Sequence, residues 1–175
     1  GLAGLSAAIE AASCNASVIV MEKTNSTGGN SAKATSGING WGTRMQGMND
    51  IEDDGRFFER DTFLSGRGGV CDVGLVKTLS VRSKESIHWL SSITGLELTT
   101  VSQLGGHSRR RTHRIPDTPK GEPVPVGWTI MSRMRQRIDQ DFKDKITIMT
   151  NTTVTGLLNE STVGEDHIRR VRVTG

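Results

Sequence analysis

Apolar residues recur along the chain at two spacings, which predict helices and short strands. Leu2, Leu5, Ile9 and Ala12 lie at helical spacing near the start, with small alanines between them, so a helix is expected there that can pack very close to a sheet. Residues 17–21 (SVIVM) are almost wholly apolar, as in a buried parallel strand. The same patterns predict further helices over residues 53–66, 73–94 and 126–141, and further strands over 145–149, 152–158 and 167–174.

Polar stretches separate these predicted elements. Residues 24–42 are rich in Gly, Ser, Asn and Thr and predict a loop. Residues 105–125 contain all four prolines and are expected to be irregular. Strands that alternate with helices are typical of an α/β fold. We therefore expect a Rossmann-like fold, with helices on both faces of a parallel sheet and insertions at 42–55 and 105–125.

Composition narrows the class of protein. The chain has 175 residues and a net charge of +3, which is too weakly basic to indicate nucleic-acid binding by itself. No apolar run approaches the roughly 18 residues of a membrane-spanning helix. Cys14 and Cys71 show no CxxC spacing, so we expect a reducing intracellular compartment. The sequence does not distinguish mitochondrion, cytosol and a peroxisome-like organelle.

The first helix and strand carry part of a dinucleotide fingerprint. Gly1 and Gly4 stand at the start of the helix, as the second and third glycines of G-x-G-x-x-G would, and Glu22 ends the next strand. The helix N-terminus would attract a pyrophosphate, and Glu22 would accept the two hydroxyls of an adenosine ribose. The alternative is an ordinary αβ unit whose helix begins with glycine, but the position of Glu22 favours the dinucleotide site.

The first glycine of the fingerprint and the strand before it are absent from the chain. We therefore expect a fragment that is cut inside the motif. A missing central strand of about six apolar residues, at roughly 1.5–3 kcal/mol for each buried side chain, is comparable to the whole stability of a domain. The isolated chain is expected to be marginally stable or unfolded.

The loop after Glu22, GGNSAKATSGIN, bears on which dinucleotide is bound. Nicotinamide-binding folds usually continue into another ordinary helix, whereas a flavin ring must lie along backbone. Small residues with free N–H groups allow that close approach. The loop therefore favours a flavin, and the alternative is a flexible Gly/Ser loop.

The blocks VMEK, TGGNSAKATSGIN, residues 57–99 and LGGHSRRRTHRIP resemble a known flavoprotein group. They are similar to the soluble fumarate reductases, and most of all to the eukaryotic NADH-dependent enzymes, within the fumarate reductase/succinate dehydrogenase flavoprotein family. The resemblance covers essentially the whole chain. It implies an FAD-binding domain that is truncated at both ends, with the capping domain and C-terminal parts beyond the sequence.

The resemblance also implies how FAD is held. Gly1 and Gly4 would hold its pyrophosphate and Glu22 its adenosine ribose. The resemblance further implies Lys23 and Gly29, from blocks that are specific to the family. Asn30, Ser31, Ser36 and Gly37 would lie along the phosphates, ribityl chain and ring, and Val154 would lie at the adenine. Gly105 and Gly106 would, with Gly37, border the substrate pocket. Asn30 stands where membrane-bound relatives carry a histidine joined covalently to FAD, so noncovalent FAD is expected.

The implied reaction is the reduction of fumarate to succinate, with hydride from flavin N5 and a proton from an arginine. The substrate-binding His and Arg of the family lie further along its chain, so we assign no catalytic residue and no metal ligand here, and we expect the fragment alone to be inactive. NADH or an attached redox domain would supply electrons. The alternatives are a flavin enzyme acting on a ketosteroid or aspartate, and a non-catalytic nucleotide-binding or basic interaction module.

The strongest charge cluster is HSRRRTHR, residues 107–114. A solvated loop face is the favoured interpretation. Positive potential near a dicarboxylate or pyrophosphate is the second, and nucleic-acid binding is disfavoured because no aromatic residues are interleaved. His113 and Arg114 match a family motif near the active site, but neither is assigned as catalytic. Glu52, Asp53 and Asp54 are interpreted as acids at a helix entry.

Overall fold

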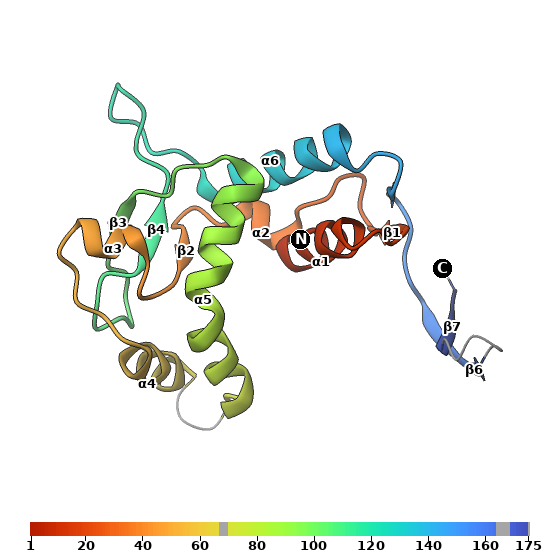
Figure 1. Cartoon of the computed structure of the whole chain (residues 1–175), viewed down its shortest axis with the longest axis horizontal. Helices are drawn as coiled ribbons and strands as arrows, with labels where there is room; N and C mark the ends of the chain where they lie inside the picture. The colour runs from red at the N-terminus through yellow and green to blue at the C-terminus, as the bar shows by residue number, and fades with distance from the viewer. Residues whose placement is uncertain (67–69, 164–168, 175) are drawn as a thin grey trace. The chain divides into compact units, whose positions relative to one another are not determined.

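The computed structural model describes residues 1–66, 70–163 and 169–174, and of residues 157–163 and 169–174 the backbone alone. The chain divides into two compact units, Gly1–Gly29 with Ile138–Gly175 and Asn30–Arg137, which we call the first and second units. Figure 1 shows the elements of both.

The first unit is a short parallel sheet with one covering helix. β1 (Val18–Met21) pairs in parallel with β5 (Ile146–Met149), and Val18 lies opposite Ile146. α1 (Leu2–Ser13) packs on both strands. Its buried side chains are Leu5, Ala8, Ile9 and Ala12, three of which belong to the predicted apolar face. The predicted helix and both strands are confirmed.

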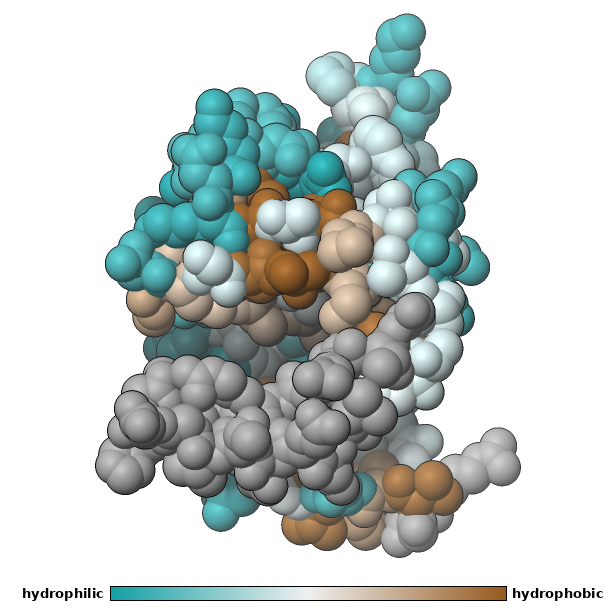
Figure 2. All heavy atoms as spheres, turned by 90° about the vertical axis from the view of Figure 1, so that its right-hand side faces the viewer, coloured by the Kyte–Doolittle hydropathy of each residue, from teal (hydrophilic) through white to brown (hydrophobic). Residues whose placement is uncertain are grey.

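The opposite face of this sheet is exposed. Ile19 is 62% exposed and Met149 44%, because side chains alternate along a strand and α1 covers only one side. Figure 2 shows a group of apolar side chains at the surface of the face turned to the viewer. In this chain, therefore, a helix covers one face of the parallel sheet.

The first unit ends in an antiparallel hairpin of β6 (Gly156–Val163) and β7 (Arg169–Thr174). The sequence predicted a strand over 152–158 and an exposed hairpin strand over 167–174. Both strands are present, and β6 starts later than predicted because residues 150–155 pair with the loop after β1 or form irregular structure.

The second unit contains two helices that pack on each other, α4 (Gly55–Ser65) and α5 (Val73–Thr94). The side chain of Asp54 caps α4 by accepting from the N–H groups of Arg56 and Phe57, and Asp72 caps α5 through the N–H of Leu75. The interpretation of Asp54 as an acid at a helix entry is confirmed. α5 ends where Gly95 adopts a left-handed conformation.

The second unit also contains a three-stranded antiparallel sheet of order β2-β4-β3. Its strands are β2 (Ile38–Asn39), β3 (Thr100–Ser102) and β4 (Thr112–Arg114). β4 is the middle strand, so the prediction that residues 105–125 are irregular is wrong at 112–114. The sequence THR shows no apolar alternation, which is why a strand there was not predicted.

The described residues also form three shorter or later helices. α2 (Gly29–Lys33) interrupts the predicted glycine-rich loop, and α3 (Arg44–Met48) follows β2 with a capping box between Thr43 and Gln46. α6 (Val126–Asp141) has the predicted bounds. Within the described residues, none of the helices is both long enough and apolar enough to cross a membrane.

Candidate functional site

The N-terminus of α1 has the properties expected of a phosphate-binding helix start. Gly1 is the N-cap and makes no side-chain cap hydrogen bond. A Cβ built on Gly4 would meet nothing within 4 Å. The first-turn N–H groups therefore have no acceptor from an N-cap side chain. The strand that a third fingerprint glycine would pack against is not among the described residues.

Glu22 follows β1 and carries an ordered carboxylate. Its Oε1 accepts from the backbone N–H and the hydroxyl of Thr24, each at 3.0 Å. The N–H of Thr24, and then its hydroxyl, lower the pKa of Glu22. The carboxylate is therefore ionised at neutral pH and held in one place, as an acceptor of ribose hydroxyls requires.

The loop that follows β5 lies beside Glu22. The Thr152 N–H donates to the Glu22 carbonyl at 2.9 Å, and the Asn151 N–H donates to the Thr24 carbonyl at 2.9 Å. Val154, predicted at the adenine, comes two residues later and is 44% exposed. The structure thus brings the predicted ribose acid together with the segment that leads to the predicted adenine position. Lys23 is exposed, and Gly29, with φ of 50°, begins α2.

In the second unit, Gly37 lies in close contact with β4. Its φ is 123°, and a Cβ there would be 2.3 Å from the His113 carbonyl oxygen and 2.9 Å from Arg114 Cγ. Only glycine fits this position, because its φ is positive and the pairing of β2, which begins at the next residue, holds it against β4. Asn30 and Ser31 lie in α2, and Ser36 is exposed just before Gly37.

The turn that contains Gly105 and Gly106 is closed by two hydrogen bonds. The His107 N–H donates to the Leu104 carbonyl at 3.2 Å, and Gln103 Nε2 donates to the His107 carbonyl at 2.7 Å. Gly106 has a φ of 82°, whereas Gly105 has free space where a Cβ would stand. The turn follows β3 and precedes β4, in the same unit as Gly37.

The basic stretch is not simply a solvated face, and the favoured interpretation is wrong for its centre. Arg111 is fully buried. Its Nε and Nη2 donate to the two oxygens of Asp53 at 2.9 and 2.8 Å, and its Nη1 donates to Asp61 Oδ2 at 2.7 Å. Phe58 packs 4.9 Å below the guanidinium. Asp53, predicted as an acid at a helix entry, is instead a partner of this buried cation.

Asp61 also binds the loop that precedes Arg111. Its Oδ2 accepts from the N–H and the hydroxyl of Ser108 at 2.7 and 2.8 Å. Burial opposes ionisation of Asp61, but the hydrogen bonds from Ser108 and Arg111 outweigh it and lower the pKa of the carboxyl. The cluster of Arg111, Asp53 and Asp61, which we call the buried triad, joins both predicted insertions, 42–55 and 105–125, to α4.

His113 is also fully buried. Its Nδ1 donates to the Arg111 carbonyl at 2.9 Å, so Nε2 is the nitrogen that accepts, from the Thr43 hydroxyl at 2.7 Å. Burial lowers the pKa of His113, which keeps the ring neutral. A neutral ring with both nitrogens bonded has a structural role, in agreement with its not being assigned as catalytic.

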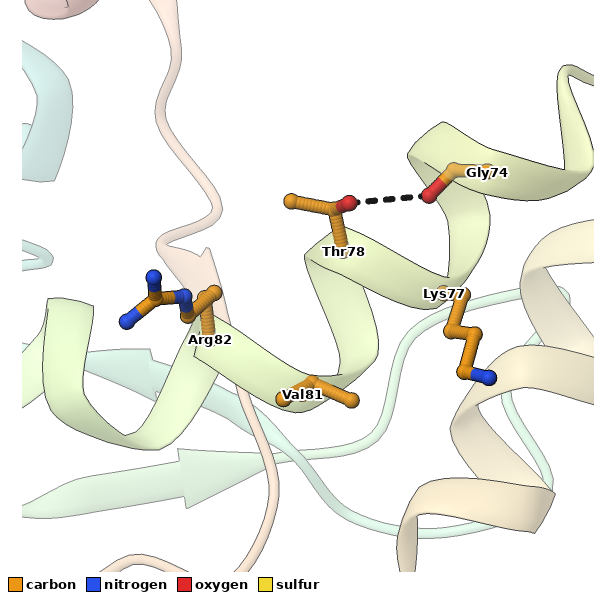
Figure 3. A pocket seen from close by; sticks show the side chains of 5 residues that line it. All are labelled: Gly74, Lys77, Thr78, Val81 and Arg82. Carbon is orange, nitrogen blue, oxygen red and sulfur yellow. Dashed lines mark hydrogen bonds between the residues drawn. The ribbon is translucent and has the colours of Figure 1, made fainter.

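A pocket of about 240 Å³ lies along α5 and contains none of the predicted site residues. Figure 3 shows that Lys77 and Arg82 point in different directions, and that Thr78 donates to the carbonyl of Gly74. The charges do not converge on one ligand, and every lining residue belongs to the same helix. Within the described residues there is no group of three or more His, Cys, Asp or Glu that could hold a metal ion.

Comparison with known families identifies the cofactor. Residues 1–175 match the family described as "FAD binding domain". The chain belongs to this FAD-binding family. It has the FAD-binding fold, and FAD is its cofactor. The α1 N-terminus, which has no side-chain cap, and the ionised Glu22, which is held by Thr24, fit the pyrophosphate and the ribose of that dinucleotide.

Individual relatives of this FAD-binding chain are fumarate reductases. Fumarate reductase 1 of Saccharomyces cerevisiae is 43% identical over 79% of the chain and 28% of the relative. The fumarate reductase of Schizosaccharomyces pombe is 34% identical over 90% of the chain and 30% of the relative. The chain therefore spans less than a third of these curated relatives. The predicted resemblance to fumarate reductase flavoproteins is confirmed.

A solved structure supports the same fold. The open conformation of a flavocytochrome c3 fumarate reductase superposes with a TM-score of 0.80 at 30% identity, covering 90% of the chain and 26% of that protein. A 3-ketosteroid-Δ4-(5α)-dehydrogenase from Rhodococcus jostii RHA1 gives a TM-score of 0.67 at 19% identity, covering 90% of the chain and 37% of that protein. The second likeness concerns the fold alone.

Proposed function

We propose that the chain is the part of a fumarate-reducing flavoprotein that holds the ADP half of FAD and one side of the flavin. The identity of 43% to a yeast fumarate reductase is the observation that carries the proposal. When bound, FAD supplies the hydride for reduction of the alkene. The substrate, the reaction and noncovalent attachment of FAD are parts of this proposal, as is the expectation that the chain alone does not turn over fumarate.

NADH is the proposed electron donor. A relative named NADH:fumarate oxidoreductase, from Klebsiella pneumoniae, is 33% identical over 90% of the chain and 16% of the relative, and it supports this choice. A protein that reduces fumarate with NADH as sole donor would agree with the proposal. Turnover with reduced viologen dye but none with NADH would point instead to an attached redox domain as donor.

Within the chain, the first unit is proposed to bind ADP. The α1 N-terminus would accept the pyrophosphate, and Glu22 would accept the ribose hydroxyls because its carboxylate is fixed by Thr24. An ionised acid at this place also repels a ribose 2′-phosphate, which favours FAD over a phosphorylated dinucleotide.

The test is FAD binding by the full-length protein that contains this chain. Glu22→Gln removes the charge while keeping the length of the side chain, and we expect roughly tenfold weaker FAD binding, since a hydrogen bond to a charged group is worth about 1.5–3 kcal/mol. Quenching of flavin fluorescence measures the affinity. Glu10→Gln, an exposed acid on α1, is the matched control for loss of one negative charge.

Three results would count against parts of the proposal. A full-length protein that is colourless and fails to take up added FAD would end it. A Glu22→Gln affinity equal to that of the wild type would remove the assigned role of this acid. Denaturation of the yellow protein is expected to release all flavin from the polypeptide, because Asn30 cannot form the covalent link, and retained flavin would contradict noncovalent binding.

A ketosteroid or aspartate as substrate remains the alternative from sequence. The ketosteroid dehydrogenase likeness, at 19% identity, concerns the fold and does not favour that substrate. Assays of the full-length protein with fumarate, aspartate and a 3-ketosteroid compare the three directly.

A further inference from the structure

Arg114 has a buried donor with no partner. Its Nε is buried, and nothing among the described residues accepts a hydrogen bond from it. Within the part of the chain that the structure describes, its ion pair is a long one, 3.6 Å from Nη2 to Oδ1 of Asp117, whose side chain is 52% exposed. An unsatisfied buried donor costs free energy, and more when it belongs to a charged group. The hydrogen-bond donors of the Arg114 guanidinium would therefore be better satisfied with a ligand bound than in the free protein.

The position of Arg114 places this donor beside the predicted flavin loop. Arg114 ends β4, and the register that pairs His113 with Ile38 puts Gly37 opposite Arg114. A Cβ on Gly37 would lie 2.9 Å from Arg114 Cγ. Because Gly37 has no side chain, there is space beside it for the first atoms of the Arg114 side chain. Both residues lie in the second unit.

Arg114 differs from Arg111, which lies three residues earlier. Arg111 uses Nε, Nη1 and Nη2 on Asp53 and Asp61, so it has no edge left for a ligand. In Arg114 the Nε–Nη2 edge makes only the long ion pair with Asp117 among the described residues. This edge of an arginine binds carboxylate and phosphate groups through two parallel hydrogen bonds. Asp117 is the weak occupant of one end of that edge.

We infer that the Nε–Nη2 edge of Arg114 is an oxyanion subsite, beside Gly37, that exchanges Asp117 for an oxyanion of the ligand. The inference rests on the proposed function and deepens it. The oxyanion is a carboxylate of the dicarboxylate substrate or a phosphate of FAD, because both offer two oxygens that can accept a pair of hydrogen bonds from one edge of an arginine.

The experiment uses the full-length flavoprotein and separates these two sources. Arg114→Gln is titrated with succinate, read by the change in visible flavin absorbance, and the apoprotein is titrated with FAD, read by quenching of flavin fluorescence. Loss of a bidentate charged contact should weaken one of the two affinities roughly tenfold or more. A weaker succinate affinity identifies the carboxylate, and a weaker FAD affinity identifies the phosphate.

Two further variants control for general charge and for folding. Arg110→Gln removes the same charge from an exposed side chain in the same stretch, and both affinities should stay within about twofold of the wild type. Asp117→Asn removes the exposed competitor and should tighten the affected affinity about two- to fivefold. This variant tests the subsite even where Arg114→Gln does not fold, because Asp117 is a surface residue.

The outcomes distinguish the inference from the function on which it rests. A wild-type protein that binds no FAD overturns both. A wild type that binds FAD, with both affinities unchanged in a folded Arg114→Gln protein, overturns the subsite alone. Unchanged affinities in Asp117→Asn, or an Arg110→Gln effect as large as that of Arg114→Gln, also overturn the subsite.

Discussion

The buried triad gives the sharpest stability prediction. Arg111→Met replaces a fully buried cation by an apolar side chain of similar length and leaves the carboxylates of Asp53 and Asp61 facing each other. The side chains of these acids are 1% and 8% exposed, so water does little to compensate. Removal of one partner from a buried ion pair costs about 3–5 kcal/mol.

This cost is a large part of the roughly 5–15 kcal/mol that keeps a domain folded. It should appear locally, because the triad ties together segments of the second unit only. Two backbone amides report on those segments: Gly40 N–H donates to the carbonyl of residue 111 at 3.0 Å, and the amide of residue 111 donates to the Ser102 carbonyl at 3.2 Å. Both bonds use backbone atoms and can therefore be followed in the variant.

Hydrogen exchange of these amides in the full-length protein is the assay. If opening of the second unit limits exchange, 3–5 kcal/mol corresponds to about 100- to 5,000-fold faster exchange. The Val18 amide, which donates to Lys145 in the first unit, is the internal control and should exchange at the wild-type rate. Exchange at Gly40 that rises by less than about fivefold, or roughly 1 kcal/mol, would refute the reasoning.

A second comparison isolates the charge. In Arg111→Met/Asp53→Asn/Asp61→Asn the acids are neutral, and Asn oxygens can still accept from Gln46 and Ser108. Replacing every member of a buried ionic cluster by uncharged groups often changes the free energy of unfolding little. We expect the triple variant to recover at least half of the loss. A triple variant as unstable as Arg111→Met would mean that lost packing, and not uncompensated charge, causes the effect.

The remaining predictions concern acid stability and a glycine. Hydrogen bonds lower the pKa of Asp61 below its unfolded value, so the stability that this carboxylate contributes is present above about pH 4 and is lost as the pH falls through the folded pKa. Unfolding followed by circular dichroism should therefore show a smaller loss of stability in acid for Asp61→Asn than for the wild type. Equal losses would contradict this. Gly37→Ala should lower the melting temperature of the full-length protein and weaken FAD binding, since its Cβ would collide with the His113 carbonyl. Gly105→Ala, where nothing lies within 4 Å, should melt like the wild type.

The long helices could be predicted from the sequence because each carries its own signal. α5 and α6 have the predicted bounds, 73–94 and 126–141, since their apolar residues recur at helical spacing and Asp72 and Gly95 cap α5. β1 was predicted because its apolar run is short and ends at an acid. Such signals are local, within a few residues of the element that they predict.

β4 and the buried triad could not be predicted, because their cause is not local. Arg111 stands in a run of three arginines, and nothing in HSRRRTHR distinguishes the buried one from Arg109 and Arg110. Its partners Asp53 and Asp61 lie 58 and 50 residues away. An acid just before a predicted helix looks the same in sequence whether it caps the helix, as Asp54 does, or binds a buried guanidinium, as Asp53 does.

The candidate site also has features that the local sequence predicts and features that only the structure shows. Glu22 was predicted from strand and spacing, and the structure adds the Thr24 hydrogen bonds and the contact with Thr152. The flavin prediction explained small residues along the loop as a whole, but it gave no separate reason for glycine at position 37. The structure supplies one, the close approach of β4, which no spacing between residues 37 and 113 reveals.

The triad and the proposed oxyanion subsite are joined through β4. Arg111 precedes Thr112 and His113, which pair with Asn39 and Ile38, and Arg114 lies opposite Gly37 at the end of the same ladder. A shift of β4 by one residue would turn every side chain to the other face of the sheet. Arg114 would then no longer face its present neighbours. The buried triad, by fixing Arg111 to Asp53 and Asp61, opposes such a shift and thereby helps to determine where Arg114 and its proposed oxyanion subsite lie.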